Sequence, residues 1–184
     1  MRQPLRKWLR GKRVGTEKTK RFVYLALLSA MAIVLSIVES VYIGPVFYMV
    51  RLGLANIVAL VTIRLLGVKE MIIVNTMRVV ISNLMRGMIF GSTFWISLGG
   101  VALSSIALII LDKMKSSLMF TSVICSICHS VGQVLVVVMF YMQPRVAAVL
   151  PYLLLGSAPM GFITGTTAKL VLDRIKPLRK DQPE

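Results

Sequence analysis

The chain has few acidic residues and no recognisable catalytic motif. Seven Asp and Glu stand against 22 Lys and Arg among its 184 residues, so the formal net charge is +15. It contains no phosphate-binding loop of the Walker A type, no paired Asp motif for magnesium diphosphate and no carboxylate cluster for metal-assisted hydrolysis. A Ser-His-Asp set at compatible depths is missing as well. We therefore expect that the protein is not an enzyme by itself.

Hydrophobic residues, in contrast, make up 57% of the chain, and charged residues only 16%. This apolar fraction lies well above that of a soluble domain and indicates an integral membrane protein surrounded by the lipid bilayer. A strongly basic chain can also bind nucleic acid, but here the basic residues cluster at the ends of apolar runs. That distribution is typical of membrane proteins, so we expect no nucleic acid partner.

Charged residues, glycines and prolines divide the apolar sequence into six runs, each near the roughly 20 residues that cross a bilayer. The pattern predicts an all-α, multi-pass membrane protein with six transmembrane helices. The expected spans are 22-42, 52-67, 71-90, 94-111, 118-142 and 146-172. A basic arm (1-21) precedes this domain of residues 22-172, and a tail (173-184) follows it. The first apolar run is longer than the core of a signal peptide, so we expect it to be retained.

The basic residues also predict the orientation of the spans. With the N-terminus inside, nine Lys and Arg in the arm, four in two loops and five near the C-terminus fall on the same side. Only Arg51 and Arg145 then fall in outer loops. Since short loops rich in Lys and Arg remain in the cytoplasm, we expect both termini to be cytoplasmic and the protein to lie in the cell membrane.

The expected span 71-90 carries a polar stripe. At about 100° per residue, Asn75, Arg78, Ser82 and Arg86 fall within roughly 80° of one another on a helix. A guanidinium keeps its charge, and each one costs a few kcal/mol or more at bilayer depth unless the protein faces it. Two interpretations remain open: the arginines reach the interface or pair structurally between helices, or they form the wall of an anion-binding pocket.

A second polar stripe on the expected span 118-142 contains the only histidine of the chain, His129, with Gln133 one turn away. A lone histidine in a helix bundle is often a hydrogen-bonded packing residue, and contact with a ligand is the alternative. Glu39 is the only acid inside an apolar run and either faces the interface or pairs with an arginine or a ligand donor. The candidate substrate-binding residues, which together outline a pocket open to the outside, are Glu39, Asn56, Arg78, Asn83, Arg86, His129 and Gln133.

Cys125, Cys128 and His129 match the C-x-x-C-H pattern of covalent haem attachment, and C-x-x-C pairs can also be redox-active. Haem attachment uses exposed, extended segments, whereas this run lies in the middle of an expected helix. We therefore expect two buried free thiols and no cofactor, with haem or thiol redox chemistry as the alternative.

Several segments carry a resemblance to a known family. The most specific of them are RLGLANIVALVTIRLLG, VNTMRVVISNLMRG, FGSTFWISLGG and SICHSVGQ. With the basic arm and the first apolar run, they resemble the Gx transporter family, also called heptaprenyl diphosphate synthase component I. This family is similar to the substrate-binding S components of energy-coupling factor transporters, which implies six helices and an outward-facing pocket. It also implies that Ala26 and Ala30, an Ala-x-x-x-Ala element, dock on a coupling subunit.

These observations lead to one functional prediction and one alternative. The predicted function is a membrane-embedded substrate-binding subunit for uptake of a small solute, either anionic or related to isoprenoids, quinones or vitamins, energised by partner ATPases. Arg78 and Arg86 would hold the anionic group, while Asn56 and Gln133 would orient the solute by hydrogen bonds. The alternative is a non-transporting membrane subunit of an isoprenoid, quinone or flavin-linked electron-transfer assembly.

Overall fold

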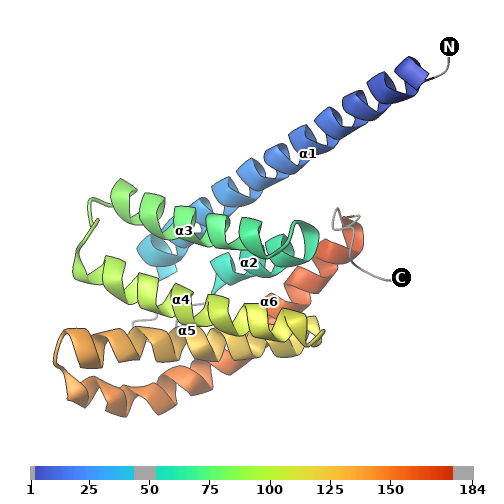
Figure 1. The fold of residues 1–184 in the computed structure, drawn as a ribbon. Coiled ribbons are helices and arrows are strands. Elements are labelled where there is room, and N and C mark those ends of the chain that lie inside the picture. The colour runs from blue at the N-terminus through green and yellow to red at the C-terminus, as the bar shows by residue number, and fades with distance from the viewer. Residues whose placement is uncertain (1–2, 44–52, 176–184) are drawn as a thin grey trace.

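The computed structural model describes residues 3–43 and 53–175, with side chains at 18–41 and 53–175 (Figure 1). The described residues form six α-helices and two short helical turns and contain no strand, so the predicted all-α class is confirmed. The elements in order are α1 (Gln3–Val38), the π-helical turn η1 (Glu39–Ile43), α2 (Leu54–Leu65), α3 (Val68–Met85), α4 (Ser92–Lys113), α5 (Leu118–Phe140), the 3-10 turn η2 (Pro144–Val149) and α6 (Leu150–Arg174).

Four helical segments of the described chain are long and apolar enough to cross a membrane: Lys18–Val41, Ser92–Lys113, Leu118–Phe140 and Pro144–Arg174. The expected spans 52-67 and 71-90 correspond to shorter or more polar helices. Because α2 has 12 residues, it is about 18 Å long, well below the ~30 Å of a hydrocarbon core. Helix α3 has 18 residues, about 27 Å, and carries three charged side chains: Lys69, Glu70 and Arg78. By length and composition, four of the six helices could thus cross a membrane in a multi-pass protein, and the topology of six spans stays a prediction.

Helix α3 begins and ends several residues earlier than the expected span 71-90. Its end is a Schellman motif, in which Gly87 N–H donates to Leu84 O at 2.9 Å and Met88 N–H donates to Asn83 O at 2.9 Å. This motif requires the left-handed backbone that Gly87 adopts, with φ 66°. Arg86 is therefore the residue that caps the helix, and not a residue inside it.

The basic arm and the first expected span form one continuous helix. Helix α1 runs over 36 residues from Gln3 to Val38, so the backbone has no break near residue 21. Figure 1 shows the N-terminal half of α1 extending away from the other helices, while its C-terminal half packs against α2 and α3.

Helix α2 lies in the interior of the bundle. It packs against α1, α3, α5 and α6. Nine of its 12 residues are buried, among them Leu60 and Ile63, which are at most 1% exposed. A helix that is apolar on all sides is stable only when other helices surround it, which explains how such a short helix is accommodated. Its first turn, at Ala55 and Asn56, forms one wall of the cavity described below.

Small residues let α4, α5 and α6 pack closely. A Cβ atom added at Gly100 would lie 2.8 Å from Cγ of Gln133 and 3.0 Å from Cε1 of His129. Gly132 faces Gly100 from α5 at a similarly short separation. Helices α5 and α6 meet in the same way, because a Cβ atom at Gly161 would lie 2.6 Å from Cα of Val123. These contacts hold α5 at a fixed position against α4 and thereby place His129.

One end of the bundle carries interhelical ion pairs. Arg21 of α1 pairs with Glu70 of α3 at 2.7 Å and also donates to Leu66 O at 3.0 Å. Arg64 of α2 approaches Asp112 of α4, with 3.5 Å between Nε and Oδ1. The C-terminal ends of α4 and α6 lie at this same end in Figure 1. This is the end that the distribution of basic residues assigns to the cytoplasm.

Candidate functional site

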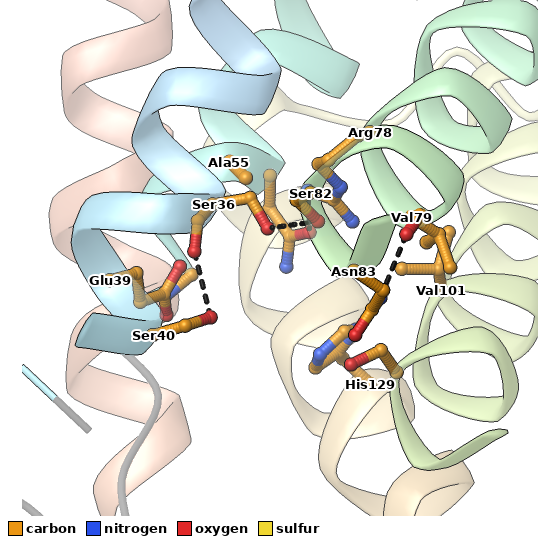
Figure 2. A pocket seen from close by; sticks show the side chains of 13 residues that line it. Ser36, Glu39, Ser40, Ala55, Arg78, Val79, Ser82, Asn83, Val101 and His129 are labelled. Carbon is orange, nitrogen blue, oxygen red and sulfur yellow. Dashed lines mark hydrogen bonds between the residues drawn. The ribbon is translucent and has the colours of Figure 1, made fainter. Parts of the chain in front are cut away.

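A polar cavity lies in the opposite half of the bundle from these ion pairs. It has about 420 Å³ of empty space, including its open mouth. Its walls come from α1 and η1, from Gly53 and the first turn of α2, and from α3, α4 and α5. Figure 2 shows Ser36, Glu39 and Ser40 on the α1 and η1 side, and Arg78, Ser82 and Asn83 on the α3 side. Of the empty space, only about 30 Å³ is open interior, which has room for a few atoms, and the remainder is the open mouth and the gaps between side chains.

Glu39 ties the end of α1 to the start of α2. Its Oε1 accepts a hydrogen bond from the backbone N–H of Gly53 at 2.6 Å, and the side chain is buried. Glu39 is also the first residue of η1, where the helix widens to the π form. Such turns inside helices occur frequently at functional sites, because they re-aim side chains that a regular helix would point elsewhere. The second carboxylate oxygen leaves acceptor capacity at the cavity wall.

Arg78 supplies the buried positive charge of the cavity. It is only 4% exposed, and its Nη1 donates to Oδ1 of Asn56 across the α2–α3 interface, at 3.4 Å. A guanidinium has five N–H donors in a planar fork, so it can bind an anion in addition to its protein partners. The position of Arg78 agrees with the predicted wall of an anion pocket.

Arg86 occupies a different position from the one its sequence pattern suggested. Its Nε donates to Ser82 O at 3.1 Å, and its Nη2 donates to Oδ1 of Asn83 at 2.8 Å. Both acceptors belong to the last turn of α3, where a positive charge stabilises the negative end of the helix dipole. Arg86 is not among the residues that line the cavity. Its predicted contact with an anion stays untested, and the structure gives it a role at the helix end.

His129 and Gln133 form the pair that their spacing suggested. The Nε2 atoms of the two side chains are 3.2 Å apart, and Gly100 of α4 packs against both residues. His129 lines the cavity, whereas Gln133 does not. Gln133 therefore orients the imidazole ring through this hydrogen bond.

The structure brings five of the seven candidate residues together. Those that line the cavity are Glu39, Asn56, Arg78, Asn83 and His129. Sequence reasoning did not assign the serine hydroxyls of the same cavity to the site: Ser36, Ser40, Ser82 and Ser97. Ser82 was already part of the polar stripe. Ser36 and Ser40 share one helix face with Glu39 at i, i+3 and i+4, and this spacing is the signal that could have identified both serines.

Ala26 and Ala30 lie outside the cavity on the exposed face of α1. Large apolar side chains flank them, including Val23, Leu27 and Met31, each about half exposed. The face is therefore apolar and available to lipid or to another protein. The predicted coupling contact at these alanines stays untested.

The two cysteines are free, with Cys125 buried and Cys128 partly buried, and both lie within helix α5. This agrees with the expected free thiols. Among the described residues, no group of three or more His, Cys, Asp and Glu side chains lies close enough to hold a metal ion.

The fold and the cavity define a multi-pass helical membrane protein with a small polar site enclosed in one half of its bundle. The model of the heptaprenyl diphosphate synthase component I family matches residues 28–171. The chain belongs to this family, which confirms the resemblance in its motifs. No curated protein and no solved structure matches the chain.

Proposed function

We propose that the protein is a membrane-embedded solute-binding subunit that takes up a small molecule carrying an anionic group. The observation that carries this proposal is Arg78, a permanent positive charge that is 4% exposed and lines the polar cavity. Burying a permanent charge costs several kcal/mol, and an anion bound at the cavity wall would offset part of that cost. A ligand that brings a carboxylate or phosphate to Arg78 would accept two parallel hydrogen bonds in a geometry that a guanidinium favours.

The remaining walls describe the rest of the ligand. Glu39 has acceptor capacity for a hydroxyl or amine, and serine hydroxyls lie between it and Arg78. Val79, Val101 and Ala55 contribute apolar surface. This mixture suits a small solute with an anionic end, one or more polar substituents and an apolar body. Such a description includes carboxylated or phosphorylated molecules related to vitamins, quinones or isoprenoids.

The proposed transport depends on partners. The sequence contains no nucleotide-binding loop, so energy would have to come from partner ATPases through a coupling subunit. The exposed apolar face of α1 around Ala26 and Ala30 supports such docking, because small residues let another helix approach closely. In this proposal the chain binds and delivers its solute without catalysis of its own.

The family description supports a second candidate function. A chain in a family described as component I of a heptaprenyl diphosphate synthase could serve as the membrane subunit of an isoprenoid or quinone assembly. In that case Arg78 would hold the diphosphate or polar head of a membrane-soluble substrate while the partner performs the chemistry. The two candidates differ in which proteins accompany the chain.

Native mass spectrometry of the gently extracted protein tests the proposal. We expect a bound small molecule of fixed mass, and ATPase subunits among the co-purified proteins. In Arg78→Met the amount of bound molecule should fall about 10- to 100-fold, as expected for the loss of a charge-assisted contact of about 1.5–3 kcal/mol. The control is Arg145→Met, which removes an exposed arginine that does not line the cavity and should leave the bound amount unchanged.

Two results would overturn the proposal. If Arg78→Met binds the solute as well as the wild type does, the cavity is excluded as the binding site. Co-purification with a prenyl-transferring or redox enzyme, and with no ATPase, would favour the second candidate over transport.

A further inference from the structure

A second, smaller cavity, which we call the inner cavity, lies next to the first one, which we call the outer cavity. It has about 220 Å³ of empty space and is lined by Asn56, Asn75, Ser104, Ser105 and Cys125, together with three apolar residues. Asn56 lines both cavities, so the two share this side chain as their common wall. No charged residue lines the inner cavity. Its chemistry is therefore neutral and polar, unlike that of the outer cavity with Arg78 and Glu39.

The amide of Asn75 has more hydrogen-bonding capacity than its neighbours satisfy. The side chain is 5% exposed, and its Nδ2 donates to Oγ of Ser105 at 2.8 Å. The Nδ2 also donates to Sδ of Met71 at 3.2 Å, whereas Oδ1 is buried and has no hydrogen-bond partner among the described residues. Rotating the amide by 180° would let Ser105 donate to Oδ1 but would leave the two N–H donors to find a partner. In either orientation one polar atom of Asn75 needs a partner that the protein does not provide, at a cost of about 1–3 kcal/mol.

The inner cavity offers the space and the polar neighbours for such a partner. Its open core has room for about one water molecule, the size of a single hydroxyl group. The O–H of Ser104 already donates to Val101 O at 3.1 Å, so the hydroxyl oxygen of Ser104 remains available as an acceptor. A hydroxyl both donates and accepts, and it would satisfy Asn75 in either amide orientation as well as a neighbouring serine. Charged or bulky groups are disfavoured, because the site has no counter-charge and little volume.

We propose that this cavity is a neutral hydroxyl-binding subsite, in which Asn75 and Ser105 hold one O–H group behind Asn56. The O–H group has two sources with the same chemistry. One is an ordered water molecule. The other is a terminal hydroxyl of the solute whose anionic end lies at Arg78, and this second source rests on the proposed function.

A crystal structure of the purified protein that shows ordered solvent tests the subsite directly. We expect electron density within hydrogen-bond distance, about 2.6–3.2 Å, of the Asn75 amide. The variant Asn75→Leu, of similar size but without polar atoms, should lose that density. The control is Thr76→Val, the adjacent residue on the exposed face of α3, where the density should persist.

The source of the hydroxyl follows from solute retention in native mass spectrometry. A solute hydroxyl predicts that Asn75→Leu retains at least 10-fold less solute than Thr76→Val. If the hydroxyl belongs to ordered water, Asn75→Leu should retain solute within about twofold of the wild type. The wild-type electron density beside Asn75 should then be an isolated peak. Either result supports the subsite.

An empty cavity in the wild-type structure, with no density beside Asn75, would overturn the subsite. This result does not depend on whether Asn75→Leu folds. Failure of the proposed function is a separate outcome. In that case Arg78→Met would keep its solute, and the electron density beside Asn75 would be unaffected.

Discussion

At the level of single residues, the two arginines of α3 differ in what surrounds them. Arg78 is buried against Asn56 at the cavity, whereas Arg86 folds back onto the last turn of its own helix. Both fall on the same stripe of a helical projection, and a projection contains no information about where the helix ends. The turn at Gly87, which closes the helix, separates their roles.

The position of Arg86 leads to a prediction about stability. Arg86→Met removes two hydrogen bonds and a favourable helix-dipole interaction, together worth about 1 kcal/mol. We expect the thermal unfolding midpoint in detergent to fall by about 2–4 °C, with solute retention unchanged. Arg145→Met, an exposed arginine outside the α-helices, is the control for loss of charge. Loss of the solute at unchanged stability would instead make Arg86 a ligand residue, as the sequence alone suggested.

At the level of helices, the crossing of α4 and α5 determines where His129 lies. Gly100 and Gly132 bring the two backbones together, and a Cβ atom at Gly132 would lie 3.0 Å from Cα of Gly100. The three atoms nearest to this added Cβ all belong to the backbone of Gly99 and Gly100, so no flexible side chain could move away. The helices would have to separate.

Gly132→Ala should therefore destabilise the protein by about 1–3 kcal/mol, the usual cost of overpacking. Because separation of α4 and α5 displaces His129 and Gln133, solute retention should fall in the same variant. Thermal unfolding and native mass spectrometry measure the two effects. Ala102→Val, on the exposed face of α4, is the matched control and should change neither. A normal unfolding midpoint for Gly132→Ala would contradict the close crossing.

The fold and the site were predictable from the sequence to different degrees. The helical class and five of the seven candidate residues follow from hydropathy and helical spacing, because both are local properties of the chain. The burial of α2 was not predictable, since a 12-residue apolar run looks like a short span until its neighbours are known. The outward displacement of Gln133 and the serines of the cavity likewise depend on how the helices rotate against one another.

At the level of the whole molecule, the basic residues predict which end faces the cytoplasm. Exposed cysteines test this in a background where Cys125 and Cys128 are replaced by serine. Lys113→Cys lies at the end with the ion pairs, and Arg145→Cys lies in η2 at the other end. A membrane-impermeant maleimide should label Arg145→Cys in intact cells and Lys113→Cys only after permeabilisation. The reverse pattern would contradict the orientation and place the cavity toward the cytoplasm.

The proposed docking face of α1 leads to a further prediction for the assembled complex. Ala30→Leu adds a bulky side chain to the exposed face, where it should prevent close approach of a partner helix. We expect at least a 10-fold loss of co-purified ATPase subunits with solute binding retained. Ala102→Leu on the exposed face of α4 is the control. Wild-type recovery of the ATPases with Ala30→Leu would exclude this face as the coupling interface.

The sequence by itself determined that the protein is helical and membrane-bound, because bilayer length and helical periodicity are read along the chain without knowledge of any distant contact. It also placed a polar stripe on α3. Only the tertiary structure decided that Arg78 faces the cavity while Arg86 caps its helix, and that the short helix α2 lies inside the bundle. The physical reason is that burial and hydrogen bonding depend on which helices meet and at what rotation. Those relations are set by small residues and turns whose effect appears only when the helices pack.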